Sequence, residues 1–179
     1  PGPLSAGWIG MIGMIFLFHF GFVKGLALYW QWNGICAGPL MRMPVAANSV
    51  GDFWGKRWNS AFRDLSFGLM FNSFRKWCGT RGATLLTFFI SGLIHELVIT
   101  LPAGGGYGLP TAYFTLQGAG LLCEHSHPAR GWLRSALHGR LFAWLIVAGP
   151  AFALFPPPFV QRVIVPFMQA IGALPGGHL

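Results

Sequence analysis

The sequence predicts an all-α, polytopic transmembrane bundle of about four to five spans with an interfacial amphipathic helix, forming one membrane domain over residues 1–179. Three observations support this fold class. Hydrophobic residues make up 54% of the chain and charged residues 9%, whereas soluble domains carry about 25% charged residues. The mean hydropathy is +0.55. The 17 Phe and 8 Trp suit the boundary between hydrocarbon and headgroups.

Four apolar segments are candidates for spans, because a spanning helix needs about 20 residues, with a range of roughly 17–25. They are 6–23, 84–101, 106–122 and 141–155, the last only when extended back to Trp132. The tail 159–174 is interrupted by Arg162 and Pro166, so it is either a short last span or an interfacial segment. Segment 6–23 lacks the features of a signal peptide. The start at Pro1, without Met, is consistent with part of a longer protein.

Turns and charges predict how these segments connect. Three prolines at 156–158 end the fourth helix, and the Gly-rich turn 102–106 joins the second and third spans into a hairpin. Both open ends of this hairpin are basic, so the positive-inside rule places loops 52–83 and 123–140 on the cytoplasmic face of an integral, multi-pass protein. Residues 60–77 carry Phe62, Leu65, Leu69 and Phe74 at helical spacing and predict an amphipathic interfacial helix.

The net charge of +8 does not indicate nucleic acid, because no basic stripe lies on a soluble module. It indicates contact with the anionic surface of a lipid bilayer, or an anionic substrate. Three cysteines, Cys36, Cys78 and Cys123, lie far apart and form neither a disulfide framework nor a zinc pattern.

His95 is the strongest chemical signal. It lies about 17 Å into segment 84–101, where an ionisable residue usually faces a cavity or a partner. The structural alternative is a neutral His that hydrogen-bonds a neighbouring helix. Glu96 points about 100° away, so we expect it to pair with a basic residue or a backbone group. His95-Glu96 does not begin a zinc-protease motif, since residue 99 is Ile99.

No metal site is expected. Residues 123–127 read Cys-Glu-His-Ser-His, but no second group of ligands has matching spacing, and an interfacial cap at a helix end is the simpler reading. His19 is a weaker version of His95, and we expect His138 and His178 at exposed or interfacial positions. The chain has no Gly-rich phosphate loop and no GxSxG motif.

The stretch Gly51-Asp52-Phe53-Trp54-Gly55-Lys56-Arg57-Trp58-Asn59 is too polar to span a bilayer and unusually aromatic for a loop. By itself it fits an aromatic belt with Lys and Arg reaching the headgroups. Together with Ser91-Gly92-Leu93-Ile94-His95-Glu96-Leu97, which follows at a spacing of 36 residues from Asn59 to His95, it resembles the membrane-bound O-acyltransferase family, in particular its wax synthase-like branch. The run from Gln117 to Glu124 resembles the next helix of that branch, and the resemblance suggests a C-terminal portion.

The resemblance implies transfer of a fatty acyl group from acyl-CoA to a lipophilic alcohol that is long-chain or sterol-like, with acyl-CoA as co-substrate and no cofactor. His95 would be the general base, since the ordinary pKa of His lies near neutral pH, and Asn59 would assist as an oxyanion-type donor. The expected substrate-binding residues are Trp54, Lys56, Arg57, Trp58, Arg63 and Ser91, of which the three basic ones would hold phosphates or anchor the membrane surface. Glu96 would not contact the substrate but would support the residues that do.

Other functions stay open at this level. Within the same chemistry, the alternative acceptors are a diacylglycerol, a sterol and a polysaccharide hydroxyl. A transporter or channel component would use His95 and Glu96 as a polar relay, although the chain shows no inverted repeat. A noncatalytic membrane scaffold would leave His95 dispensable.

Overall fold

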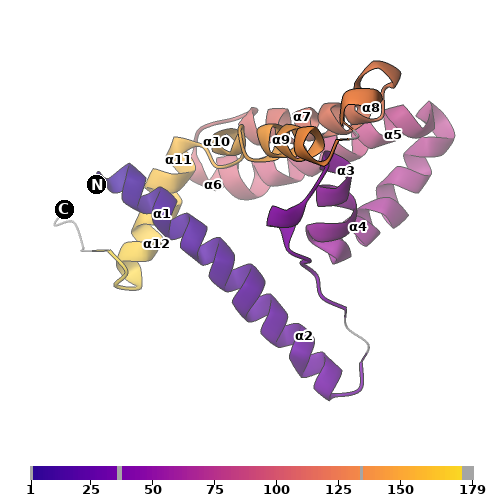
Figure 1. Cartoon of the computed structure of the whole chain (residues 1–179). Helices are drawn as coiled ribbons and strands as arrows, with labels where there is room; N and C mark the ends of the chain where they lie inside the picture. The colour runs from indigo at the N-terminus through magenta and orange to yellow at the C-terminus, as the bar shows by residue number, and fades with distance from the viewer. Residues whose placement is uncertain (1, 36–37, 134, 175–179) are drawn as a thin grey trace.

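The structure is a computed structural model that describes residues 2–35, 38–133 and 135–174, with only the backbone at Pro3 and His19 (Figure 1). Within these ranges every regular element is a helix and none is a strand, which confirms the all-α fold class. Cys36, Arg134 and His178 lie outside the described residues, as does the side chain of His19. In the described part of the chain, three helical stretches are long and apolar enough to cross a membrane, fewer than the four to five expected.

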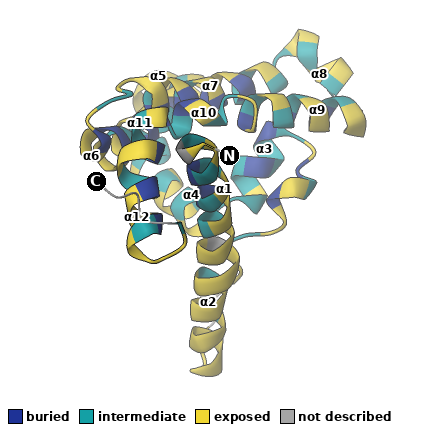
Figure 2. Cartoon of the chain, turned by 90° about the vertical axis from the view of Figure 1, so that its left-hand side faces the viewer, coloured by how far each residue is buried: buried dark blue, intermediate teal, exposed yellow. Residues whose placement is uncertain are grey.

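The first of these stretches, Leu4–Trp32, is longer than the predicted segment 6–23. It joins α1 (Pro3–Phe16), the π-helical η1 (Leu17–Phe22) and α2 (Val23–Trp32). The helix reaches away from the rest of the chain, and its far part is exposed (Figures 1 and 2). Lys24 does not end it, because one Lys can extend its long side chain toward the interface.

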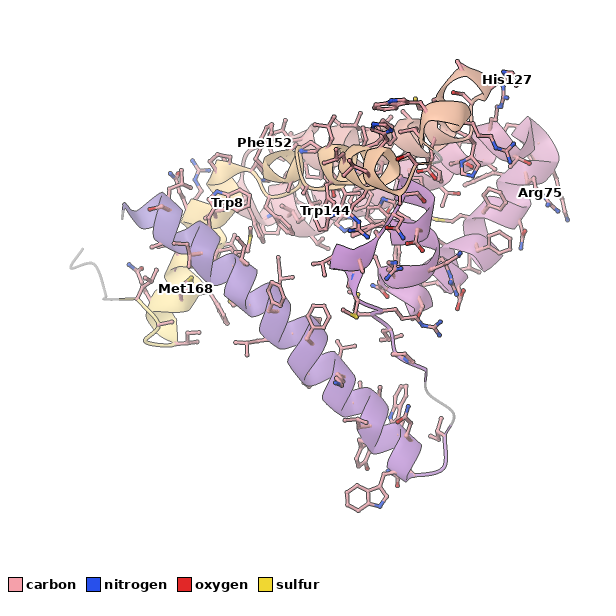
Figure 3. The ribbon with its side chains drawn as sticks, in the orientation of Figure 1. Trp8, Arg75, His127, Trp144, Phe152 and Met168 are labelled. Atoms are coloured by element: carbon pink, nitrogen blue, oxygen red, sulfur yellow. The ribbon has the colours of Figure 1, made fainter. Side chains whose placement is uncertain are left out.

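The beginning of this helix packs against the tail. The tail forms α11 (Pro157–Phe159), the π-helical η6 (Val160–Ile164) and α12 (Val165–Ala170), and α1 contacts both η6 and α12. Met168 lies against Gly10 of α1, where a larger residue would collide with it (Figure 3). The tail is therefore a packed, short helical segment, and it is not one of the three candidate spans.

The second stretch runs from Ser60 to Ala103 and has 44 residues. The predicted interfacial helix 60–77 and the predicted span 84–101 both lie within it, on either side of a break in the helical backbone at Gly79. Gly79, with φ 67° and ψ 179°, redirects the helix between the two parts. The elements are α4 (Ser60–Ser66), π-helical η4 (Phe67–Phe71), α5 (Asn72–His95), π-helical η5 (Glu96–Thr100) and α6 (Leu101–Ala103).

The predicted hairpin is present, because α5 packs along α7 (Leu109–Glu124). The turn between them contains Gly104, Gly106 and Gly108, all with positive φ, a conformation that glycine adopts without strain. This turn delays the start of α7 to Leu109 and leaves a helix of 16 residues, near the lower limit for a span.

The third stretch, Ala136–Leu154, contains α9 (Ala136–Val147) and α10 (Ala151–Leu154). The expected extension back to Trp132 is wrong, since Trp132 lies in the separate helix α8 (His127–Leu133). Prolines 156–158 end the third stretch as predicted: α10 stops at Leu154, and Pro156 is the residue before the next helix, α11. The start of α5 and helix α8 lie at the same end of the molecule (Figure 1).

Between the first and second stretches, residues 38–59 form a compact connection with η2 (Pro44–Ala46, a 3-10 turn), α3 (Val50–Asp52) and the π-helical η3 (Phe53–Arg57). Ser49 caps α3 by accepting the Asp52 N–H at 2.9 Å, a typical role for Ser before a helix.

Candidate functional site

The pair α5–α7 is the framework of the site. Gly92 of α5 faces the backbone of Thr111 in α7 so closely that a Cβ there would lie 2.6 Å from Thr111 Cα. One turn later Glu96 reaches the beginning of α7, where its Oε1 accepts from Thr111 N–H at 3.1 Å and from Thr111 Oγ1 at 2.9 Å. Thr100 Oγ1 donates to the other oxygen at 2.5 Å. A carboxylate suits this place, because the first N–H groups of a helix lack partners within it.

A second link joins α7 to the connection 38–59 and to α9. The Gln117 side chain is fully buried (0% exposed). Its Oε1 accepts from Trp54 Nε1–H at 3.2 Å, and its Nε2 donates to the carbonyl of Ile146 at 2.7 Å. Trp54 also lies edge-on to Phe88 of α5, with ring centroids 5.6 Å apart. One buried amide thus fixes the orientation of the indole between two helices.

The end of α7 fixes α3. Glu124 accepts from the backbone N–H of Val50 at 2.7 Å and of Gly51 at 3.3 Å. The expected helix end at residues 123–127 is therefore present, and its carboxylate holds another segment of the chain. In the described part of the chain, no group of three or more His, Cys, Asp or Glu side chains is arranged to hold a metal ion.

A cavity of about 530 Å³, here called the aromatic cavity, lies between the connection 49–59, the arm α4–η4, α5 and α7. Its walls are largely apolar, from Phe62, Phe67, Phe71, Phe88 and Phe114. Gly79 at the bend separates the arm from the wall formed by Thr84–Ser91. The cavity therefore has the size and lining of a site for a largely apolar ligand.

The aromatic cavity brings together most of the residues expected to bind substrate. They come from two segments of the sequence and are Trp54, Lys56, Trp58, Asn59, Arg63 and Ser91. Part of the Arg63 side chain is already bonded within the protein, because its Nη1 donates to the carbonyl of Gly55 at 2.5 Å and its guanidinium pairs with Asp64.

Arg57 is not among the lining residues. Its Nε donates to Asp52 Oδ2 at 2.6 Å, and its Nη1 donates to the carbonyls of Arg42 and Met43, each at 3.3 Å. Burial tends to raise the pKa of Asp52, but hydrogen bonds from Arg57 and the Asn48 N–H, with the charges of Arg57 and Lys56, outweigh it and hold that pKa below its ordinary value. The geometry gives Arg57 a structural role beside the cavity.

His95 lies next to the cavity and not in its lining. Its ring packs on the ring of Phe114 with centroids 4.2 Å apart, and Phe114 lines the cavity. Its Nδ1 is 2.7 Å from the carbonyl oxygen of Ser91. A carbonyl only accepts, so this contact assigns the proton of the neutral ring to Nδ1 and leaves Nε2 as an acceptor.

Asn59 also has a local role. It has φ 39° and ψ 71°, in the left-handed region that Asn tolerates better than most residues. Its Oδ1 accepts from Phe62 N–H at 3.1 Å and caps α4. The carboxamide thus has its oxygen engaged by the helix while the residue lines the cavity.

Glu96 does not line the aromatic cavity. It lines a separate, open groove of about 900 Å³ on the pair α5–α7, together with Leu93, Tyr107 and Thr111. The expected backbone partner of Glu96 is present as Thr111 N–H. The described residues provide no cationic partner for Glu96.

The residues of the site that the sequence analysis did not single out as parts of it include Phe114, Gln117 and Thr87. Phe114 and Thr87 are ordinary members of apolar helices. Gln117 is an amide in an uncharged apolar segment, where a polar side chain usually has a hydrogen-bond partner. Its partner Trp54 is 63 residues away, so the sequence does not identify it.

Comparison with known proteins places this geometry in context. Residues 37–116 match the model of the membrane bound O-acyl transferase family. The chain is 36% identical over 81 residues to a long-chain-alcohol O-fatty-acyltransferase of Simmondsia chinensis, covering 41% of this chain and 20% of that protein. It is 30% identical over 123 residues to a probable long-chain-alcohol O-fatty-acyltransferase 8 of Arabidopsis thaliana, covering 62% of this chain and 37% of that protein.

A probable long-chain-alcohol O-fatty-acyltransferase 1 of Arabidopsis thaliana is 31% identical over 108 residues, covering 54% of this chain and 31% of that protein. The chain thus matches between a fifth and about two fifths of the length of these curated relatives. No solved structure matches it. The matched region includes the 51–59 stretch, His95 and the start of α7, which confirms the family resemblance expected from the sequence.

Proposed function

We propose that this chain, whose residues 37–116 match the model of the membrane bound O-acyl transferase family, forms part of an enzyme that transfers a fatty acyl group from acyl-CoA to a long-chain alcohol. The main structural support is the aromatic cavity, which gathers Trp54, Trp58, Asn59 and Ser91 and adjoins His95. The relatives named for long-chain alcohols favour this acceptor over a diacylglycerol, a sterol or a polysaccharide.

In the proposed reaction His95 acts as the general base. Nε2 takes the proton of the alcohol hydroxyl while the alcohol oxygen attacks the thioester carbonyl. The tetrahedral intermediate then collapses, the carbon–sulfur bond breaks, and the CoA thiolate leaves with the proton returned by the imidazolium. The bond from Nδ1–H to Ser91 holds the ring in the tautomer that this step needs.

Asn59 is proposed to stabilise the oxyanion. Its Oδ1 is held by Phe62 N–H, so the NH₂ of the same carboxamide is the group left to donate to a carbonyl oxygen. A preorganised donor of this kind is worth a factor of about 10²–10³ in rate. Trp54 and Trp58 would form part of the cavity wall against the ligand. Glu96 would support the site by holding α7 to α5.

The CoA phosphates are proposed to lie at Lys56 and Arg63, the basic residues that line the cavity. Arg57 would contribute by fixing the connection through Asp52. Loops 52–83 and 123–140 would face the cytoplasm, in keeping with their basic residues and with the position of α8 and the start of α5 at the same end of the molecule (Figure 1).

The test uses membranes that contain the full-length protein, labelled acyl-CoA and a panel of long-chain alcohols, sterols and diacylglycerols. We expect a labelled ester with long-chain alcohols and its loss in His95→Ala. His127→Ala is the control, because His127 is an exposed residue of α8 (Figure 3) and is not among the residues that line the cavity. Equal ester formation by wild type and His95→Ala, at equal protein level, would overturn the mechanism, and no ester with any acceptor would overturn the function.

A further inference from the structure

The buried hydroxyl side chains of α5, η5 and α7 have partners within the protein, with two exceptions among the described residues. Thr84 and Thr115 each donate from Oγ1 to the carbonyl four residues earlier, at 2.9 and 2.7 Å, while Thr100 and Thr111 donate to the Glu96 carboxylate. The hydroxyls of Thr87 and Ser91 in α5 are buried and have no hydrogen-bond partner among the described residues. A buried polar group left without a partner costs about 1–3 kcal/mol.

The two exceptions both line the aromatic cavity. Ser91 is 4% exposed, so its hydroxyl is shielded from bulk solvent. Phe88 and Phe114 line the same cavity, and aromatic rings offer no strong acceptor to a hydroxyl. The partner of these hydroxyls is therefore expected to come from a ligand inside the cavity.

Their spacing gives the direction of that ligand. Thr87, Ser91 and His95 follow one another at intervals of four residues, so they lie on one side of α5 about 6 Å apart. The cavity lining also includes Lys56 and Arg63. A CoA thioester with its phosphates at the two basic residues and its reacting carbon at His95 would extend its pantetheine arm past Thr87.

We propose that the Thr87 hydroxyl binds the acyl donor by hydrogen-bonding the amide of the pantetheine arm nearest the thioester, with the Ser91 hydroxyl between that amide and His95. The inference rests on the proposed acyl transfer and deepens it. The arm is uncharged and crosses an apolar space, so its amides need partners there. Thr87 thereby selects a donor that carries an amide at a fixed distance from the reacting carbon.

The experiment compares Thr87→Val, which keeps the shape and removes the hydroxyl, with Thr87→Ser, which keeps the hydroxyl. Three donors with the same acyl chain are used: acyl-CoA, the N-acetylcysteamine thioester, which keeps the nearest amide, and the propanethiol thioester, which has none. We expect Thr87→Val to lower kcat/KM about tenfold with the first two donors and to leave the third unchanged. Thr87→Ser should stay near wild type with all three.

Thr115→Val is the matched control, because the Thr115 hydroxyl is bonded within α7 and is outside the aromatic cavity. Calorimetric binding of free CoA gives a readout besides activity, and Thr87→Val should weaken it by a similar factor. Each variant is first checked for an unchanged thermal unfolding midpoint.

The outcomes separate the two proposals. If wild type transfers acyl groups and Thr87→Val is equally impaired with all three donors, or with none, the inference is wrong and the proposed function stands. A loss that depends on the alcohol and not on the donor would assign Thr87 to the acceptor and also overturn it. If wild type acylates no acceptor, the proposed function fails and the inference fails with it.

Discussion

The helical stretches Leu4–Trp32 and Ser60–Ala103 each contain an apolar segment of 18 residues with the same mean hydropathy of 1.8. Only 6% of that segment is buried in the first stretch, whereas 22% is buried in the second. The first reaches away from the remaining chain, while the second carries one wall of the aromatic cavity (Figures 1 and 2). Apolar character alone therefore does not distinguish a helix that builds the site from one that does not.

What distinguishes them is the small and polar residues of the second helix. Gly92 lets α7 approach its backbone, Glu96 bonds the beginning of α7, and Gly79 bends the helix around the cavity. Small residues allow close packing of helices in a membrane, and polar groups join them. In the first helix only the beginning is packed in this way, by Gly7 and Gly10 against the tail. Farther along it, Gly13, Gly21 and Gly25 have no atom within 4 Å of an added Cβ in the described structure.

Glu96 should give the largest effect. In Glu96→Ala the Thr111 N–H and two hydroxyls lose their acceptor, so we expect the free energy of unfolding in detergent to fall by about 3 kcal/mol. Glu96→Gln keeps one acceptor oxygen and should lose about half as much. Wild-type stability of Glu96→Ala would show that this carboxylate does not join α5 to α7.

Gly92→Ala should come next. Its Cβ would lie 2.6 Å from Thr111 Cα and 3.2 Å from the Thr111 carbonyl oxygen, both backbone atoms. The two helices must separate, which we expect to cost about 1–3 kcal/mol in unfolding free energy. Gly13→Ala, in the open part of the first helix, should instead leave stability unchanged or raise it by about 0.4–1 kcal/mol. If Gly92→Ala and Gly13→Ala changed the thermal unfolding midpoint equally, the closer packing of the second helix would not contribute to stability.

Gly79→Ala tests the bend. At φ 67° and ψ 179° the strain is conformational, since no atom lies within 4 Å of the added Cβ. We expect a loss of about 1–2 kcal/mol and, because the arm α4–η4 and the helix after the bend line opposite parts of the cavity, weaker CoA binding by calorimetry. Gly68→Ala, an open helical position in η4, is the control and should leave both measurements unchanged.

The sequence predicted the helices better than the bends and turns that connect them. Segment 84–101 and the hairpin were predictable because an apolar run and a Gly-rich turn are local signals. The bend between residues 60–77 and 84–101 was not, because a Gly inside an otherwise helical pattern does not by itself reveal the non-helical φ and ψ that Gly79 adopts. The short α7 was missed for a related reason: three glycines with positive φ, up to Gly108, delay its start.

The site could be predicted only in part, and mainly through the family resemblance. The resemblance selected Trp54, Asn59 and Ser91, which the fold places on one cavity. It also selected Arg57, whose guanidinium is engaged with Asp52. The bond from Trp54 to Gln117 joins residues that no local pattern relates, and the unbonded hydroxyl of Thr87 depends on its rotamer, which a sequence does not specify.

The Asp52–Arg57 pair should give the smallest effect, and it lies outside both helices of the comparison. The pKa of Asp52 is held below its ordinary value, so the pair stabilises the fold fully above the unfolded pKa of about 3.9 and loses that contribution as the pH falls through the lower folded value. Asp52→Asn should therefore unfold more easily than wild type near neutral pH, by less than about 1 kcal/mol because both side chains are partly exposed.

The difference between wild type and Asp52→Asn should shrink as the pH falls below about 4. Lys56→Gln is the matched control, since Lys56 contributes only its charge to Asp52, and it should change stability less than Asp52→Asn. Thermal unfolding across this pH range measures the effect. If the stability difference between wild type and Asp52→Asn grew as the pH fell, the folded chain would not stabilise the Asp52 carboxylate. The Asp52–Arg57 pair would then not engage the guanidinium of Arg57, which could bind phosphates instead.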